Sequence, residues 1–136
     1  QASSCSASIN ALGGFTAGAM CLLDSNSADS NGAGTVNRYG FTITGTGTRV
    51  VNNYATNNVN GFLVSSTNAY FHGNTASNNA TYGFAANGSM NGLYIGNTSS
   101  GNGTAFAIGG GNGYGAVMNT PGANFSATNP AANYAP

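Results

Sequence analysis

The chain has 136 residues, and five small or polar residue types, Asn, Gly, Ala, Ser and Thr, account for 93 of them. Only four residues, Asp24, Asp29, Arg38 and Arg49, are charged, so the chain lacks both the basic surface of a nucleic-acid-binding protein and the charges of a solvated amphipathic helix. No apolar run approaches the roughly 18 residues of a membrane-spanning helix. We therefore expect one domain that binds no nucleic acid and does not insert into a membrane.

Residues 1–34 lack the repeat that follows them, and we interpret them as an N-terminal cap or a degenerate first coil. The start at Gln1, without an initiator Met, suggests a mature end produced by export. In an oxidising compartment Cys5 and Cys21 would form a disulfide that closes a 17-residue loop and contributes about 3 kcal/mol. Two free buried thiols are the alternative. These features favour a secreted, extracellular or cell-surface protein.

Between residues 35 and 124, two columns of residues recur every 21 to 23 positions. The first column consists of phenylalanines, each in a segment that alternates like a strand: Phe41, Phe62, Phe84 and Phe106. The second column consists of asparagines: Asn53, Asn74, Asn97 and Asn119. A unit of this length cannot bury its own apolar face, whereas successive units wound into a solenoid pair with one another at about 4.8 Å spacing. The sequence predicts an all-β parallel β-helix, or β-solenoid, of about four clear coils with the phenylalanines stacked in its core.

Asparagine suits the corners of such a coil, because it tolerates left-handed backbone angles and its amide bonds to the local backbone. Stacked Asn side chains also bond to one another along the coil axis. We therefore expect the asparagine column to form a structural ladder. A second set keeps the same spacing and marks another corner: Asn58, Asn79, Asn102 and Asn124.

The period of two along each strand indicates which side chains face the core. With the phenylalanines inward, four further residues point inward: Ile43, Val64, Ala86 and Ile108. A strand before each ladder Asn has two possible registers. Either one column faces inward, Val51, His72, Ile95 and Val117, or its neighbour does, Val50, Phe71, Tyr94 and Ala116. A third short strand runs through Ala55, Ala76 and Ser99.

Several segments carry a family resemblance. The motif Phe-His-Gly-Asn-Thr-Ala-Ser-Asn-Asn at 71–79, Tyr-Gly-Phe at 82–84 and Ile-Gly-Asn-Thr-Ser-Ser-Gly-Asn at 95–102 resemble the repeats of the pectate-lyase-like superfamily, and NosD-like repeats in particular. The resemblance covers residues 35–124 and implies a right-handed parallel β-helix. It implies no single function, because this architecture carries lyases, hydrolases, adhesins and phage spikes.

Residues 125–136 carry no strand signal and contain Pro130 and Pro136. We expect a disordered tail, an arm laid over the last coil, or a segment given to another subunit. Both ends of a solenoid expose unpaired strand edges, which natural proteins protect with lysines and inward charges. This chain has no lysine, so stacking between subunits is open to it.

Few residues are suited to catalysis. The resemblance implies that enzymes of this fold use acidic calcium ligands with a base, or clustered aspartates, yet Asp24 and Asp29 are the only acids and lie outside the clear coils. His72 is the sole imidazole and has no acidic or cysteine partner nearby in the sequence. No Cys or His pair has the spacing of a zinc site, and no glycine-rich segment is typical of a phosphate loop. We expect no enzymatic activity, no cofactor and no metal.

The predicted function is that of a non-catalytic extracellular structural protein, whose stacked β-solenoids and terminal segments join copies into a surface fibre or matrix. The alternative is a glycan-binding adhesin or spike module, in which outward tyrosines stack on sugar rings of a polysaccharide. Ice binding is a weaker third hypothesis. It is suggested by Thr42 and Thr44, but their columns continue as Leu63 and Ser65, so a regular threonine grid is absent there.

Overall fold

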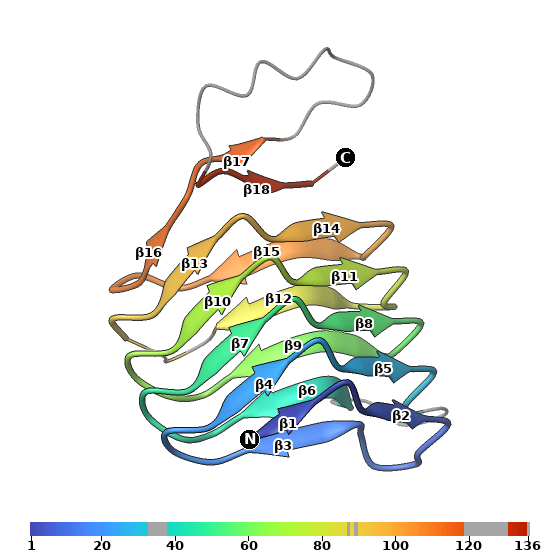
Figure 1. The fold of residues 1–136 in the computed structure, drawn as a ribbon. Helices are drawn as coiled ribbons and strands as arrows, with labels where there is room; N and C mark the ends of the chain where they lie inside the picture. The colour runs from blue at the N-terminus through green and yellow to red at the C-terminus, as the bar shows by residue number, and fades with distance from the viewer. Residues whose placement is uncertain (33–37, 87, 89, 119–130, 136) are drawn as a thin grey trace.

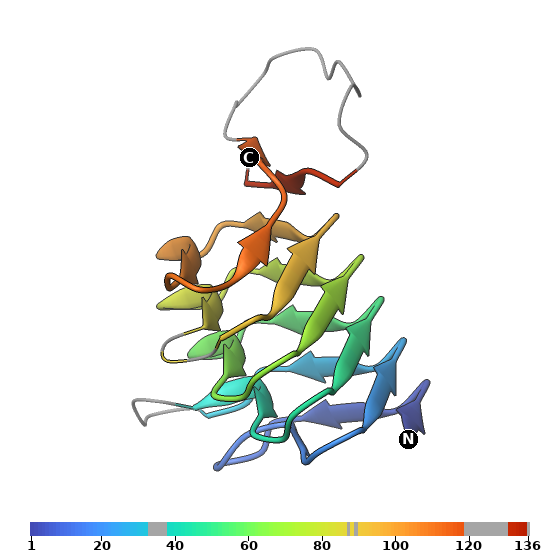
Figure 2. The same cartoon turned by 90° about the vertical axis from the view of Figure 1, so that its left-hand side faces the viewer.

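The computed structural model describes residues 1–32, 38–86, 88, 90–118 and 131–135. Within these ranges the chain forms eighteen short strands and no helix. The strands form three parallel sheets that run along one axis, so the protein is a parallel β-solenoid of about five turns (Figures 1 and 2). The predicted all-β solenoid fold is confirmed.

Each of the five complete turns gives one strand to each of three sheets, A, B and C, and three more strands follow the fifth turn. Sheet A contains, in order, β1 (Ala2–Ser3), β4 (Leu22–Asp24), β7 (Arg49–Val51), β10 (Tyr70–His72), β13 (Leu93–Ile95) and β16 (Gly113–Tyr114). Sheet B contains β2 (Ser6–Ser8), β5 (Ser27–Asp29), β8 (Tyr54–Thr56), β11 (Thr75–Ser77), β14 (Thr98–Ser100), β18 (Asn133–Tyr134) and β17 (Val117–Met118). Sheet C contains β3 (Phe15–Ala17), β6 (Tyr39–Ile43), β9 (Asn60–Val64), β12 (Tyr82–Ala86) and β15 (Thr104–Ile108).

The N-terminal region belongs to the solenoid. Residues 1–34, which we interpreted as a cap or a degenerate first coil, contain β1 to β3, a complete first turn, and two of the three strands of the second turn. The repeat is hidden in the sequence because the second turn is longer: Phe15 pairs with Phe41, 26 positions later, instead of 21 or 22.

The phenylalanine column forms one continuous stack inside sheet C. Its rings lie 4.8 to 5.0 Å apart, centroid to centroid, with interplanar angles of 2° to 11°. The stack comprises Phe15, Phe41, Phe62, Phe84 and Phe106. Its three central rings are buried, and the two end rings are partly buried. Stacked aromatic pairs contribute about 0.5 to 1.5 kcal/mol each beyond the burial of their area.

The register of sheet A is now decided. Val50, Phe71 and Tyr94 are fully buried, and the rings of Phe71 and Tyr94 stack at 5.1 Å. The alternative column therefore faces solvent up to Ile95, and His72 in it is exposed. The last members of both predicted columns are wrong, because Val117 lies in β17 of sheet B and Ala116 is exposed. The other inward residues of sheet C lie as the alternation predicts: Ile43, Val64 and Ala86 are buried, and Ile108 packs partly buried against them.

Left-handed residues turn the chain at both ends of every complete strand of sheet B. At each such corner one residue has φ between 52° and 66°, and the residue after it is buried or partly buried in every turn except the first. Between sheets A and B these residues are Ser4, Ser25, Asn52, Gly73 and Gly96. Between sheets B and C they are Ile9, Ser30, Asn57, Asn78 and Gly101. This conformation suits Asn and Gly, which explains part of the unusual composition.

Candidate functional site

The first asparagine ladder runs along the corner between sheets A and B. From Asn53 onward, each Asn Oδ1 accepts two hydrogen bonds from the previous rung, one from the backbone N–H and one from the side-chain Nδ2. These bonds are 2.9 to 3.1 Å long, and the ladder residues are at most 1 % exposed. The members are Asn26, Asn53, Asn74, Asn97 and Asn133.

The second ladder repeats this arrangement at the corner between sheets B and C. Its members are Asn10, Asn31, Asn58, Asn79 and Asn102. The buried amide nitrogens also donate to backbone carbonyls, as Asn58 Nδ2 does to Ala28 O at 3.0 Å. From β5 to β14, both ends of each sheet B strand are thereby fixed by buried or partly buried polar contacts, which are costly to break in a low-dielectric interior.

The sequence located the centre of both ladders and missed their ends. Asn53, Asn74 and Asn97 take the predicted place, whereas Asn119 and Asn124 lie outside the described residues. The last described position of the first ladder is taken by Asn133, from the C-terminal segment. The two ladder residues of each complete rung are five positions apart in the sequence, as Asn26 and Asn31 are. This spacing is the signal that identifies the missed rungs at the N-terminal end.

The expected disulfide is not present: Cys5 and Cys21 are free cysteines. Cys5 occupies the rung position of Asn26, and its backbone N–H donates to Asn26 Oδ1 at 3.0 Å. Cys21 precedes Leu22 at the opposite end of the sheet A strands. In this register the two residues lie five positions apart along the strand direction, roughly 15 Å in an extended chain. A disulfide requires Cα atoms within about 7 Å of each other.

The N-terminal end of the solenoid is an open edge. The first-turn strands β1, β2 and β3 each have a partner on one side only. Large apolar side chains are exposed around this end, with Ile9 80 %, Leu12 73 % and Met20 84 % accessible. A hollow also opens there, lined by Gln1, Ala2, Thr16, Ala17, Cys21, Leu22 and Leu23. The first 23 residues include no charged side chain.

The C-terminal end is built differently. Sheet C ends at β15, and sheet A ends at β16, which pairs with β13. In sheet B the strand order departs from the chain order, because β18 lies between β14 and β17 (Figure 1). This end therefore combines an open edge in sheet C with an inserted strand in sheet B.

A small polar and aromatic group lies on the outer face of sheet A. The guanidinium carbon of Arg49 lies 4.9 Å from the ring centroid of Tyr70, and the ring of His72 lies 6.1 Å from that of Tyr70. Arg49 and His72 are exposed, and Tyr70 is partly exposed. A cation over an aromatic ring holds that ring in place.

The outer face of sheet B carries hydroxyl groups in two columns. Its later rungs present Thr75 beside Thr98 and Ser77 beside Ser100. Tyr54, which is 55 % exposed, and Asp29 interrupt the columns. On sheet C the column from Thr42 continues as Leu63. A regular threonine grid is therefore absent from the described outer faces of both sheets.

The two aspartates and the histidine lie apart on the outer faces. Asp24 is in β4 of sheet A and Asp29 is in β5 of sheet B. A hydrogen bond from Thr56, at 2.8 Å, and one from Asn57, at 3.0 Å, lower the pKa of Asp29. Among the described residues no three His, Cys, Asp or Glu side chains are grouped so that they could hold a metal ion.

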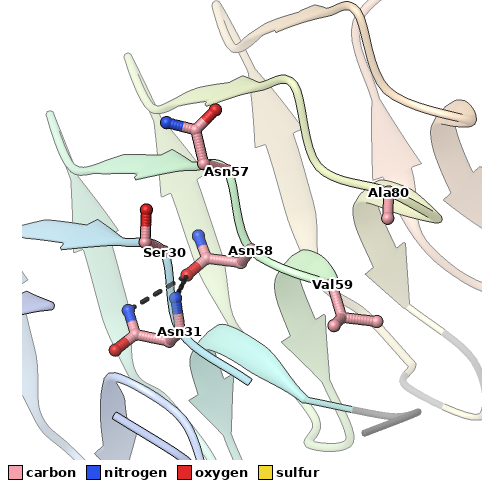
Figure 3. Close-up of a pocket in the computed structure, with 6 residues that line it drawn as sticks. All are labelled: Ser30, Asn31, Asn57, Asn58, Val59 and Ala80. Carbon is pink, nitrogen blue, oxygen red and sulfur yellow. Dashed lines mark hydrogen bonds between the residues drawn. The ribbon is translucent and has the colours of Figure 1, made fainter. Parts of the chain in front are cut away.

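A hollow at the corner between sheets B and C contains no ionisable side chain (Figure 3). Its wall includes Asn31 and Asn58, which belong to the second ladder and bond to each other at 3.0 Å. The remaining lining residues are Ser30, Asn57, Val59 and Ala80. The polar atoms of the ladder residues are directed along the solenoid axis, and this leaves hydroxyl, amide and methyl groups to contact a ligand.

No helix in the described part of the chain has the length and apolar character needed to cross a membrane. Comparison with protein-family models gives no match, and neither a curated protein nor a solved structure matches the chain. The expected membership of the pectate-lyase-like superfamily therefore rests on the resemblance of the repeats alone. The geometry identifies the chain as a parallel β-solenoid of about five turns.

Proposed function

We propose that this protein is a non-catalytic structural subunit that associates with copies of itself through the ends of its solenoid. Its setting would be an extracellular fibre or matrix. The single observation that carries the proposal is the open first turn, which presents three strands with unpaired edges beside exposed apolar side chains. An unprotected edge of this kind is a template for pairing with another chain.

The protection that natural edges use is missing at this end. The first turn contains no charged residue, no proline and no covering element among the described residues. The flat ring of Phe15 ends the phenylalanine stack there and is only partly buried. Burial of exposed apolar area against a second copy is favourable at about 25 cal/mol per Å².

The second ladder offers complementary groups at its two ends. At the first rung, Asn10 donates to Asn31 Oδ1, and its own Oδ1 accepts no hydrogen bond from the described residues. At the last rung, the Asn102 side chain is engaged, whereas its backbone N–H has no acceptor among the described residues. An acceptor at one end and a donor at the other favour contact between unlike ends of two copies, on the part of the C-terminal end that β18 leaves open.

The test is the concentration dependence of particle mass, measured by analytical ultracentrifugation and followed by electron microscopy. Lysine at Ile9 and Leu12 should reduce association, because both side chains are exposed at the open end and burying an added charge in the joint is unfavourable. Met90→Lys is the matched control, since Met90 is a 56 % exposed apolar residue away from that end. A wild-type protein that is strictly monomeric at high concentration would refute the proposal.

Glycan binding is the second candidate, and the ring of Tyr70 beside Arg49 and His72 is the observation that favours it. An aromatic ring held on a flat sheet suits stacking against a sugar ring, and the neighbouring donors suit its hydroxyls. A glycan array compares wild type with Tyr70→Ala and with Tyr54→Ala, a change on sheet B. Binding that is lost only in Tyr70→Ala, with association unchanged, would favour this candidate.

A further inference from the structure

The C-terminal strand β18 occupies its place in sheet B out of chain order. It pairs in parallel with β14, through Thr98 and Tyr134, and with β17, through Val117 and Asn133. The strand therefore enters a slot between two strands that precede it in the chain. This arrangement is strand addition within one molecule.

The slot recognises β18 mainly through Asn133. Its Oδ1 accepts from the backbone N–H of Asn97 at 3.0 Å and from Asn97 Nδ2 at 3.1 Å. Its Nδ2 donates to Tyr94 O at 2.9 Å and to Gly115 O at 3.1 Å. The backbone adds a bond from Tyr134 N–H to Asn97 O at 2.7 Å. Asn133 is fully buried, so this is a specific site for an extended strand.

The inserted segment also repeats the sequence of an internal rung. Asn133-Tyr134-Ala135 is identical to residues 53–55, which form the rung of the third turn. The registers match, because Ala135 follows the residue paired with Thr98 and is 5 % exposed, and Ala55 is buried in the same way. The slot thus accepts an Asn-x-Ala strand whether or not it continues directly from β14.

The slot is incomplete without this strand. Removal of Asn133 leaves the buried backbone N–H of Asn97 without an acceptor, which is unfavourable in the interior. The opposite end of sheet B does not offer the same site. Cys5 stands there in place of an asparagine, and no Oδ1 is present to accept from an added rung.

We propose that the slot between β14 and β17 is a joint between copies of this chain, filled in trans by residues 133–135 of a second copy. This inference rests on the proposed self-association and identifies one of its contacts. The same hydrogen bonds form in cis and in trans, so the exchange is close to balanced and rising concentration favours the linked form.

The experiment traps the strand in place with full-length chains. Both native cysteines are first replaced by serine. One variant then carries Thr98→Cys and the other carries Tyr134→Cys. These positions are paired in adjacent strands. Their Cα atoms lie about 4.8 Å apart, within the range of a disulfide. When the two variants are mixed and oxidised slowly, a disulfide between chains of different type forms above the collisional background only if β18 crosses to another copy.

The control mixes Thr98→Cys with Thr75→Cys, a residue of the same face and column. We expect the Thr98–Tyr134 pair to give about tenfold or more heterodimer than the control pair, with a yield that rises with concentration. Adding Asn133→Ala to the Tyr134→Cys chain should lower that yield about tenfold, because the strand loses its buried amide contacts.

Light scattering on the same samples separates this inference from the proposed function. Association with a heterodimer yield no higher than the control overturns the strand exchange and leaves end-to-end association standing. Monomers without a cross-link overturn both. If the disulfide-linked heterodimer still forms in chains that carry Ile9→Lys and Leu12→Lys, the strand exchange is supported. The joint at the slot between β14 and β17 is then independent of the N-terminal end.

Discussion

Replacement of one ladder asparagine tests whether the buried amides hold the solenoid together. Asn53 is fully buried, and its Oδ1 accepts from the Asn26 backbone N–H and from Asn26 Nδ2, both at 2.9 Å. Its Nδ2 lies 2.9 to 3.1 Å from Leu23 O, Val51 O and Asn74 Oδ1. The variant Asn53→Ala removes all of these contacts at once.

The expected loss of stability follows from which groups are left unpaired. The Asn26 backbone N–H loses its acceptor and costs about 1 to 3 kcal/mol, since Asn26 is only 1 % exposed. Asn26 Nδ2 keeps its bond to Ala2 O. The remaining amide bonds contribute about 1 kcal/mol each, partly offset where the carbonyls have other donors. We expect Asn53→Ala to lower the free energy of unfolding by about 3 to 5 kcal/mol.

The neighbouring residue provides the control. Asn52 is exposed, with φ of 56°, and Asn52→Gly keeps a left-handed corner without a buried contact. We expect a change within about 0.5 kcal/mol for this variant. Urea unfolding followed by circular dichroism measures both variants at equal protein concentration. An Asn53→Ala loss below about 1 kcal/mol would refute the idea that the buried hydrogen bonds of the ladder hold the corners of the solenoid together.

Three further predictions concern the core, the carboxylate and the thiols. Phe62→Ala should lower the free energy of unfolding by about 3 to 5 kcal/mol, because Phe62 is fully buried between two stacked rings. Phe106→Ala should lower it clearly less, because Phe106 is partly exposed at the end of the stack. Urea unfolding measures both variants, and equal losses would contradict the stacked core. Hydrogen bonds lower the pKa of Asp29, so the ionised carboxylate stabilises the fold above the ordinary carboxyl pKa, and this contribution is lost as the pH falls through the lowered pKa. Thr56→Val should raise the pKa of Asp29, measured by NMR titration. An unchanged pKa would exclude the hydrogen bond from Thr56. Cys5 and Cys21 should both react with a thiol reagent in the unfolded, unreduced protein, whereas a protein without reactive thiols would contain the disulfide that the structure lacks.

The sequence predicts the middle of this fold well because chemistry repeats there at a nearly constant interval. The phenylalanine and asparagine columns have independent functions, one apolar and one amide, yet share a single period, which only a stacked coil explains. The register of sheet A was open for a physical reason. Its outward column contains Val51 and Ile95 as well as His72, so alternation of apolar and polar residues is too weak to separate the two faces.

The ends were harder to predict because the repeat is altered there. The second turn is lengthened, so Asn26 and Asn53 are 27 positions apart, and a search at a fixed period passes over the first two turns. Asn133 reaches the ladder from a segment that is not contiguous with it, and no periodic argument finds such a residue. The cysteine pairing was inferred from compartment and count alone, without the register that separates Cys5 from Cys21.

The composition that first suggests disorder follows from the geometry of the coil. Each complete rung of sheet B requires two left-handed corner residues, and four of the five complete rungs place a buried or partly buried asparagine after each corner, with mostly small side chains between. These positions select Asn, Gly, Ser, Thr and Ala, and no position in the interior accepts a charge at acceptable cost. Low charge also leaves the edges without electrostatic protection. The same residue choice that builds the ladders therefore leaves the ends able to add strands, and this connects the structure of one coil to the association that we propose.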